Sequence, residues 1–208
     1  MEKYITILND GVAEYTDRKS VFIGYAKPCK REREALDFIA AIRKKHSDAR
    51  HNVYAYNIKE NNTTRYSDDG EPQGTAGIPV LEVIRKKELV DVAVVVTRYF
   101  GGILLGGGGL IRAYTQAASD ALCAGVIVSF DVFTPVSVVC AYSEYDRLMF
   151  EINKITHKML STDYTDRVEM KFNVKSDEVD VFEERITDIF GGRLKLCRGE
   201  EIFDYLGQ

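Results

Sequence analysis

A glycine-rich segment between two arginines is the strongest chemical signal in the chain. It contains six glycines: Gly101, Gly102, Gly106, Gly107, Gly108 and Gly109. Glycine lets the backbone approach a ligand closely, and the free N–H groups at the start of a helix attract anions. Arg98 and Arg112 flank the segment with positive charge. We therefore expect a loop that contacts phosphate or another anion.

The spacing of these glycines disfavours two common nucleotide-binding motifs. The segment contains no G-x-G-x-x-G, and no Lys-Ser or Lys-Thr pair closes a G-x-x-x-x-G. Dinucleotide-binding and Walker-type proteins are therefore poor models for this site.

Three further residues could assist such a site. His51, at the start of a strand pattern, can act as a base, contact phosphate or serve as an ordinary hydrogen-bonding residue. Tyr99 can stack on a base, although tyrosines on strands more often pack in the core. Lys19 adds a cation near the N-terminus. We include all three in the candidate RNA-binding or anion-binding set.

Three carboxylates form a second candidate site on a polar segment, at Asp68, Asp69 and Glu71. Carboxylates on one loop can hold Mg²⁺ or, if their pKa values differ, exchange protons. The simpler interpretation is that they satisfy N–H groups of turns and helix caps. No histidine cluster supports a metal at a recognisable spacing, so we expect no cofactor and keep Mg²⁺ as an alternative.

Composition limits the function classes. The 208 residues carry a formal net charge of −4, which argues against a protein that coats nucleic acid without specificity but permits a local basic patch. The four cysteines lack zinc-type spacing, and no motif supports a covalent mechanism. No apolar run approaches a membrane span, so we expect a cytoplasmic protein. The lack of a motif for covalent catalysis favours a protein that is not an enzyme, and a small-molecule enzyme stays an alternative.

The first part of the chain, up to about residue 131, reads as one layered α/β domain. Apolar periodicity predicts the following elements: strands at 4–8, 12–16, 21–26, 51–59 and 91–97, and helices at 32–46, 75–87 and 110–124. Thr75 is expected to cap the second helix, and Gly125 to end the third. The segment 60–73 is expected to be a polar loop.

From residue 135 to 208 the pattern restarts as a second domain. It predicts strands at 136–141, 159–164, 168–174 and 193–198, and helices at 144–156 and 179–190. This βαββαβ order is typical of a ferredoxin-like fold with both helices on one face of the sheet.

Several motifs in the same order resemble the YigZ/IMPACT family. They are Arg18-Lys19-Ser20-x-Phe22, Ala49-x-His51-x-x-Tyr54-Ala55-Tyr56, Ser67-Asp68-Asp69-Gly70-Glu71-Pro72-x-Gly74-Thr75-Ala76-Gly77 and Val95-Val96-x-Arg98-Tyr99-Phe100-Gly101-Gly102-x-x-Leu105-Gly106. The resemblance is strong over 18–122, and the later region looks like the small C-terminal domain of bacterial members. Many members carry threonine where this chain has Gly107.

The resemblance implies an α+β protein of two domains. The first would be a two-layer α/β domain similar to domain two of ribosomal protein S-five, and the second a ferredoxin-like domain similar to a module of elongation factor G. Members of this kind are regarded as regulators of translation that bind RNA or ribosomes.

Our leading hypothesis is a non-catalytic, translation-associated protein whose glycine-rich loop contacts RNA or the ribosome. One alternative is an Mg²⁺-dependent enzyme or nucleotide binder that uses the three carboxylates. The other is an adaptor that binds a protein partner. The sequence leaves the oligomeric state open.

Overall fold

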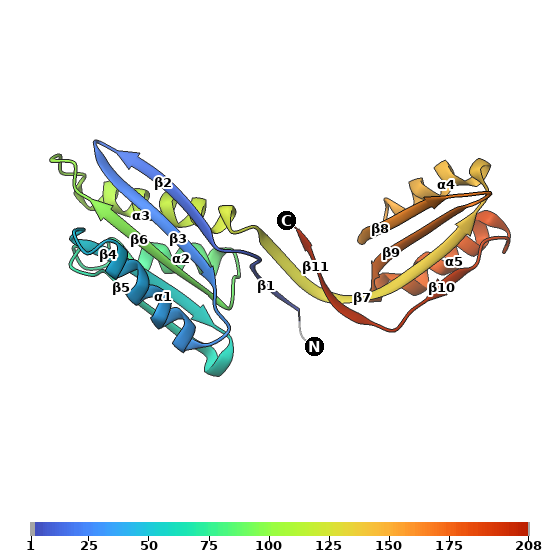
Figure 1. Cartoon of the computed structure of the whole chain (residues 1–208), viewed down its shortest axis with the longest axis horizontal. Coiled ribbons are helices and arrows are strands. Elements are labelled where there is room, and N and C mark those ends of the chain that lie inside the picture. Colours follow the sequence, from blue (N-terminus) through green and yellow to red (C-terminus); the bar gives the residue numbers. More distant parts are fainter. Residues whose placement is uncertain (1–2, 208) are drawn as a thin grey trace. The chain divides into compact units, whose positions relative to one another are not determined.

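The computed structural model describes residues 3–207, which form two compact units, Tyr4–Ser129 and Phe130–Leu206 (Figure 1). Each unit combines an antiparallel sheet with helices, so the α+β class is confirmed. Residues 131–135, where the pattern predicts the domain boundary, lie within the long strand β7 (Ile127–Cys140). No helix in the described part of the chain is long and apolar enough to cross a membrane.

The N-terminal unit is built on a five-stranded sheet. Its strand order is β2-β3-β6-β4-β5, with β2 at Gly11–Asp17, β3 at Ser20–Pro28, β6 at Val92–Tyr99, β4 at His51–Ile58 and β5 at Thr63–Ser67. All neighbouring strands are antiparallel. A short strand, β1 (Tyr4–Ile7), precedes them. β5 lies where the sequence predicts a polar loop, because this edge strand carries few apolar residues to reveal its period.

Helices cover both faces of this sheet, although the sequence predicts two layers. Val92, Val94 and Val96 of β6 pack with α2 (Gly77–Lys86) and α3 (Gly106–Ala124). The alternate residues Ala93 and Val95 pack with α1 (Glu32–Lys45). Successive side chains of a strand point to opposite faces, so burial of both faces explains why β6 is apolar throughout.

α3 lies unusually close to the sheet. A Cβ atom on Gly24 would lie 2.3 Å from the carbonyl oxygen of Ala117, so only glycine fits at this position of β3. The helix faces the sheet with four fully buried alanines, Ala113, Ala117, Ala118 and Ala121. This close contact fixes the axis of α3 and therefore the position of its first turn.

The starts of α2 and α3 differ from the sequence prediction. α3 begins at Gly106 rather than Leu110, so the four consecutive glycines form its first turn instead of a loop. Thr75 does not cap α2, because its hydroxyl donates to the carbonyl oxygen of Pro72 at 2.7 Å. α3 ends at Ala124 with Gly125 as its C-cap, as predicted, and the left-handed residue that follows is Val126 (φ 62°).

The C-terminal unit has the predicted ferredoxin-like order. β7 is followed by α4 (Tyr142–Ile152), β8 (His157–Tyr164), β9 (Val168–Lys175), α5 (Val179–Phe190) and β10 (Leu196–Arg198). In the sheet β10, β7, β9 and β8 follow one another as antiparallel neighbours, and β1 also pairs with β7. A further strand, β11 (Ile202–Gly207), pairs with β7 and is absent from the prediction, which ended at Arg198. The described residues also include two short 3₁₀ helices, at Glu60–Asn62 and Ser176–Glu178.

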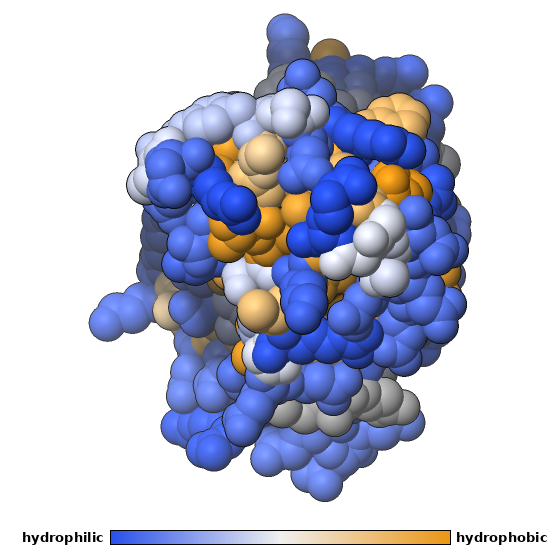
Figure 2. All heavy atoms as spheres, turned by 90° about the vertical axis from the view of Figure 1, so that its right-hand side faces the viewer, coloured by the Kyte–Doolittle hydropathy of each residue, from blue (hydrophilic) through white to orange (hydrophobic). Residues whose placement is uncertain are grey.

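Both helices of this unit pack on one face of its sheet, where they bury β7 and β9 residues such as Val138 and Phe172. The other face carries a groove of about 360 Å³ whose lining includes Leu160, Lys171 and Cys197. Figure 2 shows one side of this unit, where apolar side chains gather at the centre and hydrophilic side chains surround them.

Candidate anion-binding site

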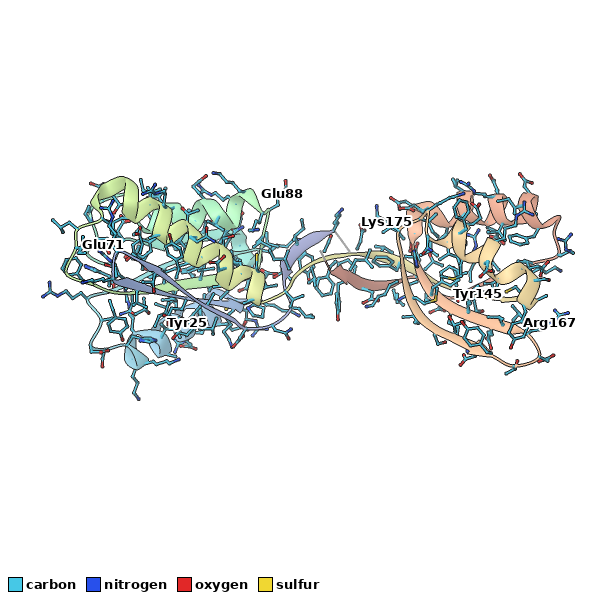
Figure 3. The ribbon with its side chains drawn as sticks, turned by 90° about the horizontal axis from the view of Figure 1, so that it is seen from above. Tyr25, Glu71, Glu88, Tyr145, Arg167 and Lys175 are labelled. Carbon is cyan, nitrogen blue, oxygen red and sulfur yellow. The ribbon has the colours of Figure 1, made fainter. Side chains whose placement is uncertain are left out.

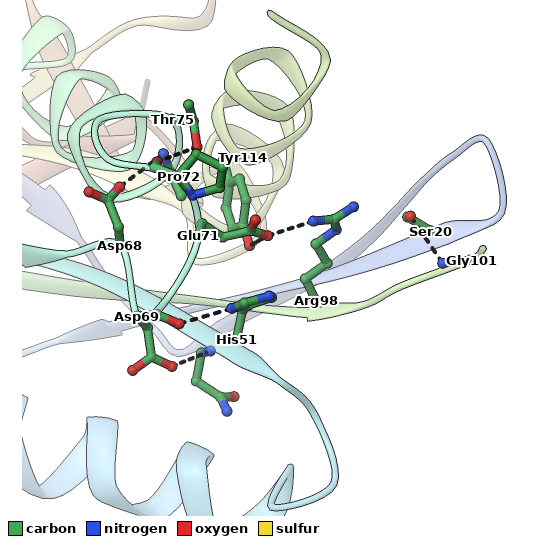
Figure 4. A network of polar contacts seen from close by, with 12 residues as sticks. Ser20, His51, Asp68, Asp69, Glu71, Pro72, Thr75, Arg98, Gly101 and Tyr114 are labelled. Carbon is green, nitrogen blue, oxygen red and sulfur yellow. Dashed lines mark hydrogen bonds and ion pairs between the residues drawn. The ribbon is translucent and has the colours of Figure 1, made fainter. Parts of the chain in front are cut away.

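The side chain of Arg98 is buried in the N-terminal unit, where an ion pair neutralises its charge (Figure 4). Its Nη1 lies 2.7 Å from Oε1 of Glu71, and the two side chains are only 7% and 3% exposed. The hydroxyl of Tyr114 on α3 donates to the same Oε1 at 2.8 Å. Burial and the charge of Glu71 raise the pKa of Tyr114 well above its ordinary value, so its hydroxyl remains a donor.

One donor of Arg98 is unused. Nε is buried and has no hydrogen-bond partner among residues 3–207. The guanidinium carbon lies 5.4 Å from the ring centroid of Phe22 and 5.5 Å from that of Phe100. The cation is thus held between two aromatic rings at the end of β6, beside the glycine-rich segment.

Asp68 stabilises the start of α2. Its Oδ1 accepts the backbone N–H groups of Ala76 at 3.1 Å and Gly77 at 2.8 Å, and its Oδ2 accepts that of Gly74 at 2.9 Å. N–H groups at the start of a helix have no partner within the helix and attract negative charge. Asp68 therefore acts as a helix cap supplied from outside the helix.

Asp69 connects the acidic loop to β4. Its carboxylate accepts from Nη2 of Arg43 at 2.7 Å and from the backbone N–H of Asn52 at 2.7 Å. Its carbonyl oxygen lies 2.9 Å from Nδ1 of His51. Because a carbonyl oxygen only accepts, Nδ1 of His51 carries a proton, and Nε2 is the ring nitrogen left for another partner.

The three carboxylates of the acidic loop therefore bind protein groups. Asp68 caps α2, Asp69 binds Arg43 and Asn52, and Glu71 binds Arg98 and Tyr114. In the described part of the chain, no group of three His, Cys, Asp or Glu side chains is placed to hold a metal ion. Asp68 follows the simpler of the two interpretations as a cap residue, whereas Asp69 and Glu71 form ion pairs that the sequence analysis did not predict.

The first turn of α3 exposes bare backbone. Its N-cap residue is Leu105, which makes no side-chain cap, and no acidic residue follows in the first turn. A Cβ atom on Gly108 would meet no described heavy atom within 4 Å, and one on Gly107 would meet only the methyl group of Thr75, at 3.8 Å. These glycines are therefore not required by packing, and the N–H groups of this turn are accessible to an anion.

Lys19 lies beside this segment. Arg18 and Lys19 are the two central residues of the β2–β3 hairpin, and both have positive φ, 45° and 68°. The backbone N–H of Gly101 donates to Oγ of Ser20 at 3.1 Å, and a Cβ atom on Gly101 would lie 2.1 Å from the carbonyl oxygen of Lys19. The hairpin and the glycine-rich segment are thus held together, which brings two exposed cations to this end of the unit.

The remaining two predicted residues, Arg112 and Tyr99, do not lie together. Arg112 is exposed on α3, four residues after Gly108, and no ion pair engages it within residues 3–207. Tyr99 follows Arg98 on the strand, so it points to the opposite face. There its hydroxyl lies 2.8 Å from Nδ1 of His46 and donates to Asp48 at 2.9 Å. Tyr99 therefore lies on the other face of the sheet from Arg98.

His46 belongs to a network that the sequence analysis missed. Its Nε2 lies 2.7 Å from the hydroxyl of Tyr25, which is on the α1 side of the sheet (Figure 3) and accepts from Nζ of Lys45 at 3.2 Å. Burial, assisted by the charge of Lys45, lowers the pKa of His46. A positive charge at the end of α1 would interact favourably with the helix dipole, but burial opposes the charged form of His46.

The fold and site define a class: a protein of two α+β units whose first unit carries an uncapped, glycine-rich helix start. Comparisons with known proteins narrow this class. Residues 18–122 match the Impact N-terminal domain, and residues 138–193 match a domain of unknown function (DUF1949). The first match includes every residue of the candidate site, from Lys19 to Arg112.

Similar proteins are found over most of the chain. The chain is 37% identical to the IMPACT family member YvyE of Bacillus subtilis over 201 residues, which cover 96% of this chain and 93% of that protein. It is 30% identical to the IMPACT family member YigZ of Escherichia coli, over 88% of this chain and 92% of that protein. A solved structure, described as a crystal structure of a hypothetical protein, matches with a TM-score of 0.59 and 28% identity over 96% of this chain and 98% of that one. The chain belongs to the IMPACT family.

Proposed function

We propose that this protein is a non-catalytic, translation-associated regulator that binds RNA or the ribosome through the start of α3. The observation that carries the proposal is the uncapped first turn of α3, which contains two glycines, Gly107 and Gly108, that packing does not require. Exposed N–H groups at a helix start favour phosphate, and close approach of a phosphate requires the absence of Cβ atoms. Family membership supports the association with translation.

The cations that assist this site are Lys19, Arg18 and Arg112, rather than Arg98. Lys19 and Arg18 are brought beside Gly101 by the hairpin contact, and Arg112 is exposed further along α3. Arg98 supports the site from within, because its ion pair with Glu71 anchors the acidic loop to β6. A cytoplasmic location is part of this proposal.

An adaptor that binds a protein partner is the second candidate, because apolar side chains are exposed at the same end. Ile103 and Leu104 are 43% and 81% exposed, and a groove of about 290 Å³ between α2 and α3 is lined in part by Ile78 and Ile111. Exposed apolar patches of this kind mark interaction surfaces. The Mg²⁺-dependent enzyme draws no support from the carboxylates, which bind protein donors.

Co-sedimentation with ribosomes across a salt series tests the proposal. We expect the protein to pellet with ribosomes at low salt and to be released as salt rises, with a log-log slope of about −0.7 per neutralised phosphate on a single strand. The double variant Lys19→Asn/Arg112→Gln should pellet less. Asn at position 19 tolerates positive φ, so this variant removes two charges without adding strain to the hairpin.

The matched control removes two exposed charges from the C-terminal unit, in the variant Arg167→Gln/Lys195→Gln. It has the same net charge as the test variant and should pellet like the wild type. Equal loss in both double variants would show a non-specific charge effect and contradict a site at α3. Absence of pelleting by the wild type at low salt would contradict ribosome binding.

A further inference from the structure

We propose that Phe100 is a stacking platform for an unpaired nucleobase, so that the site accepts single-stranded RNA in preference to duplex RNA. The inference rests on the proposed function and specifies its ligand. Phe100 follows β6 directly, outside the strand, and half of its side chain is exposed (50%).

The backbone on both sides of Phe100 is anchored. Tyr99 is tied through its hydroxyl to His46 and Asp48, and Gly101 is tied through its N–H group to Ser20. Gly101 also touches the backbone of Lys19 so closely that no side chain fits there. An exposed aromatic ring is therefore presented from a fixed backbone rather than from the tip of a free loop, which reduces the entropy lost on binding.

Arg98 supports the ring from within the unit. Residues 98 and 100 are two apart along the chain, and the guanidinium carbon of Arg98 lies 5.5 Å from the centroid of the Phe100 ring. The buried ion pair with Glu71 fixes this guanidinium in turn. A ring backed by a cation on one side keeps its other side for a ligand.

The surroundings favour RNA over a protein as the occupant. The backbone of Lys19, which follows Arg18 in the hairpin, contacts Gly101 next to the ring, and the helix α3 with its bare N–H groups begins six residues after Phe100. Cations and free N–H groups suit the phosphates of a strand, and an aromatic ring between them suits a base. In a duplex the bases are already stacked and paired, so only a single strand can use such a ring.

Binding of a labelled oligouridylate and of the corresponding adenine–uracil duplex, followed by fluorescence anisotropy, tests the inference. Oligouridylate neither pairs nor stacks strongly on itself, so its bases are free. We expect Phe100→Leu to weaken single-strand binding by about tenfold, the range of one stacking contact. Phe100→Trp, which restores an aromatic face, should bind as the wild type does.

Two controls separate stacking from charge and folding. Inorganic polyphosphate, which has no bases, should bind wild type and Phe100→Leu equally in calorimetric titrations. Phe150→Leu alters a phenylalanine that is 62% exposed on α4 and should leave all affinities unchanged. Unaltered oligouridylate binding by Phe100→Leu, or equal loss of polyphosphate binding, would overturn the stacking platform alone. A wild type that binds neither probe would overturn the proposed function together with it.

Discussion

The side chains of Arg98 and Glu71 form an ion pair of 2.7 Å that is almost closed to water. Breaking a buried pair leaves an uncompensated charge, which destabilises a protein by about 3–5 kcal/mol. We therefore predict that Glu71→Gln lowers the free energy of unfolding by this amount, measured by urea denaturation. The double variant Arg98→Met/Glu71→Met should be more stable than Glu71→Gln, because it leaves no charge unpaired. A loss below about 1 kcal/mol in Glu71→Gln would indicate that water reaches the pair.

Asp68 should matter for stability rather than for metal binding. Asp68→Ala leaves three backbone N–H groups at the start of α2 without their acceptor, so we expect a loss of about 1–2 kcal/mol in the free energy of unfolding. Glu82→Ala, which alters a partly exposed acid on the same helix, is the control and should have little effect.

Millimolar Mg²⁺ should leave the melting temperature of the wild type unchanged relative to an equal ionic strength of sodium chloride. A ligand that binds only the folded state raises the melting temperature, whereas the carboxylates of Asp68, Asp69 and Glu71 already bind protein donors. A specific increase with Mg²⁺ that Asp69→Asn abolishes would contradict this assignment and revive the enzyme hypothesis.

His46 should make stability depend on pH. Burial lowers its pKa in the folded state, so the unfolded chain binds a proton first as the pH falls. The contribution of His46 to the free energy of unfolding is therefore fully present above its ordinary pKa near 6.5, and it decreases as the pH falls below that value. His46→Gln should unfold with a weaker pH dependence between pH 8 and pH 5 than the wild type. Identical pH profiles for the two proteins would show that burial does not lower the pKa of His46.

Periodicity predicted most of the fold but little of the site. The apolar pattern identified β6 and α5 because their burial on the sheet repeats with the period of each element. The apolar pattern missed the first turn of α3, because glycine has a low helix propensity. In the structure, the close packing of α3 on Gly24 overrides this low propensity. Spacing along the chain also assigned Arg98 and Glu71 to different sites, since nothing local indicates that β6 brings them together.

Gly108 should show a conflict between stability and binding. Its Cβ atom would meet no described heavy atom, and its φ is not positive, so Gly108→Ala should raise the free energy of unfolding by about 0.5–1 kcal/mol. The same methyl group would hinder a phosphate at the start of α3, so RNA affinity should fall. If the variant is more stable and binds RNA normally, the glycines serve another purpose.

Amide chemical shifts in two-dimensional ¹H–¹⁵N spectra, recorded as oligouridylate is added, test the central claim most directly. This chain of 23.5 kDa is within reach of such spectra. We predict that the largest shifts occur at the amides of Gly106–Gly109 and Gly101, with smaller changes at Lys19. Shifts confined to the C-terminal sheet, or an unchanged spectrum, would contradict an RNA site at the start of α3.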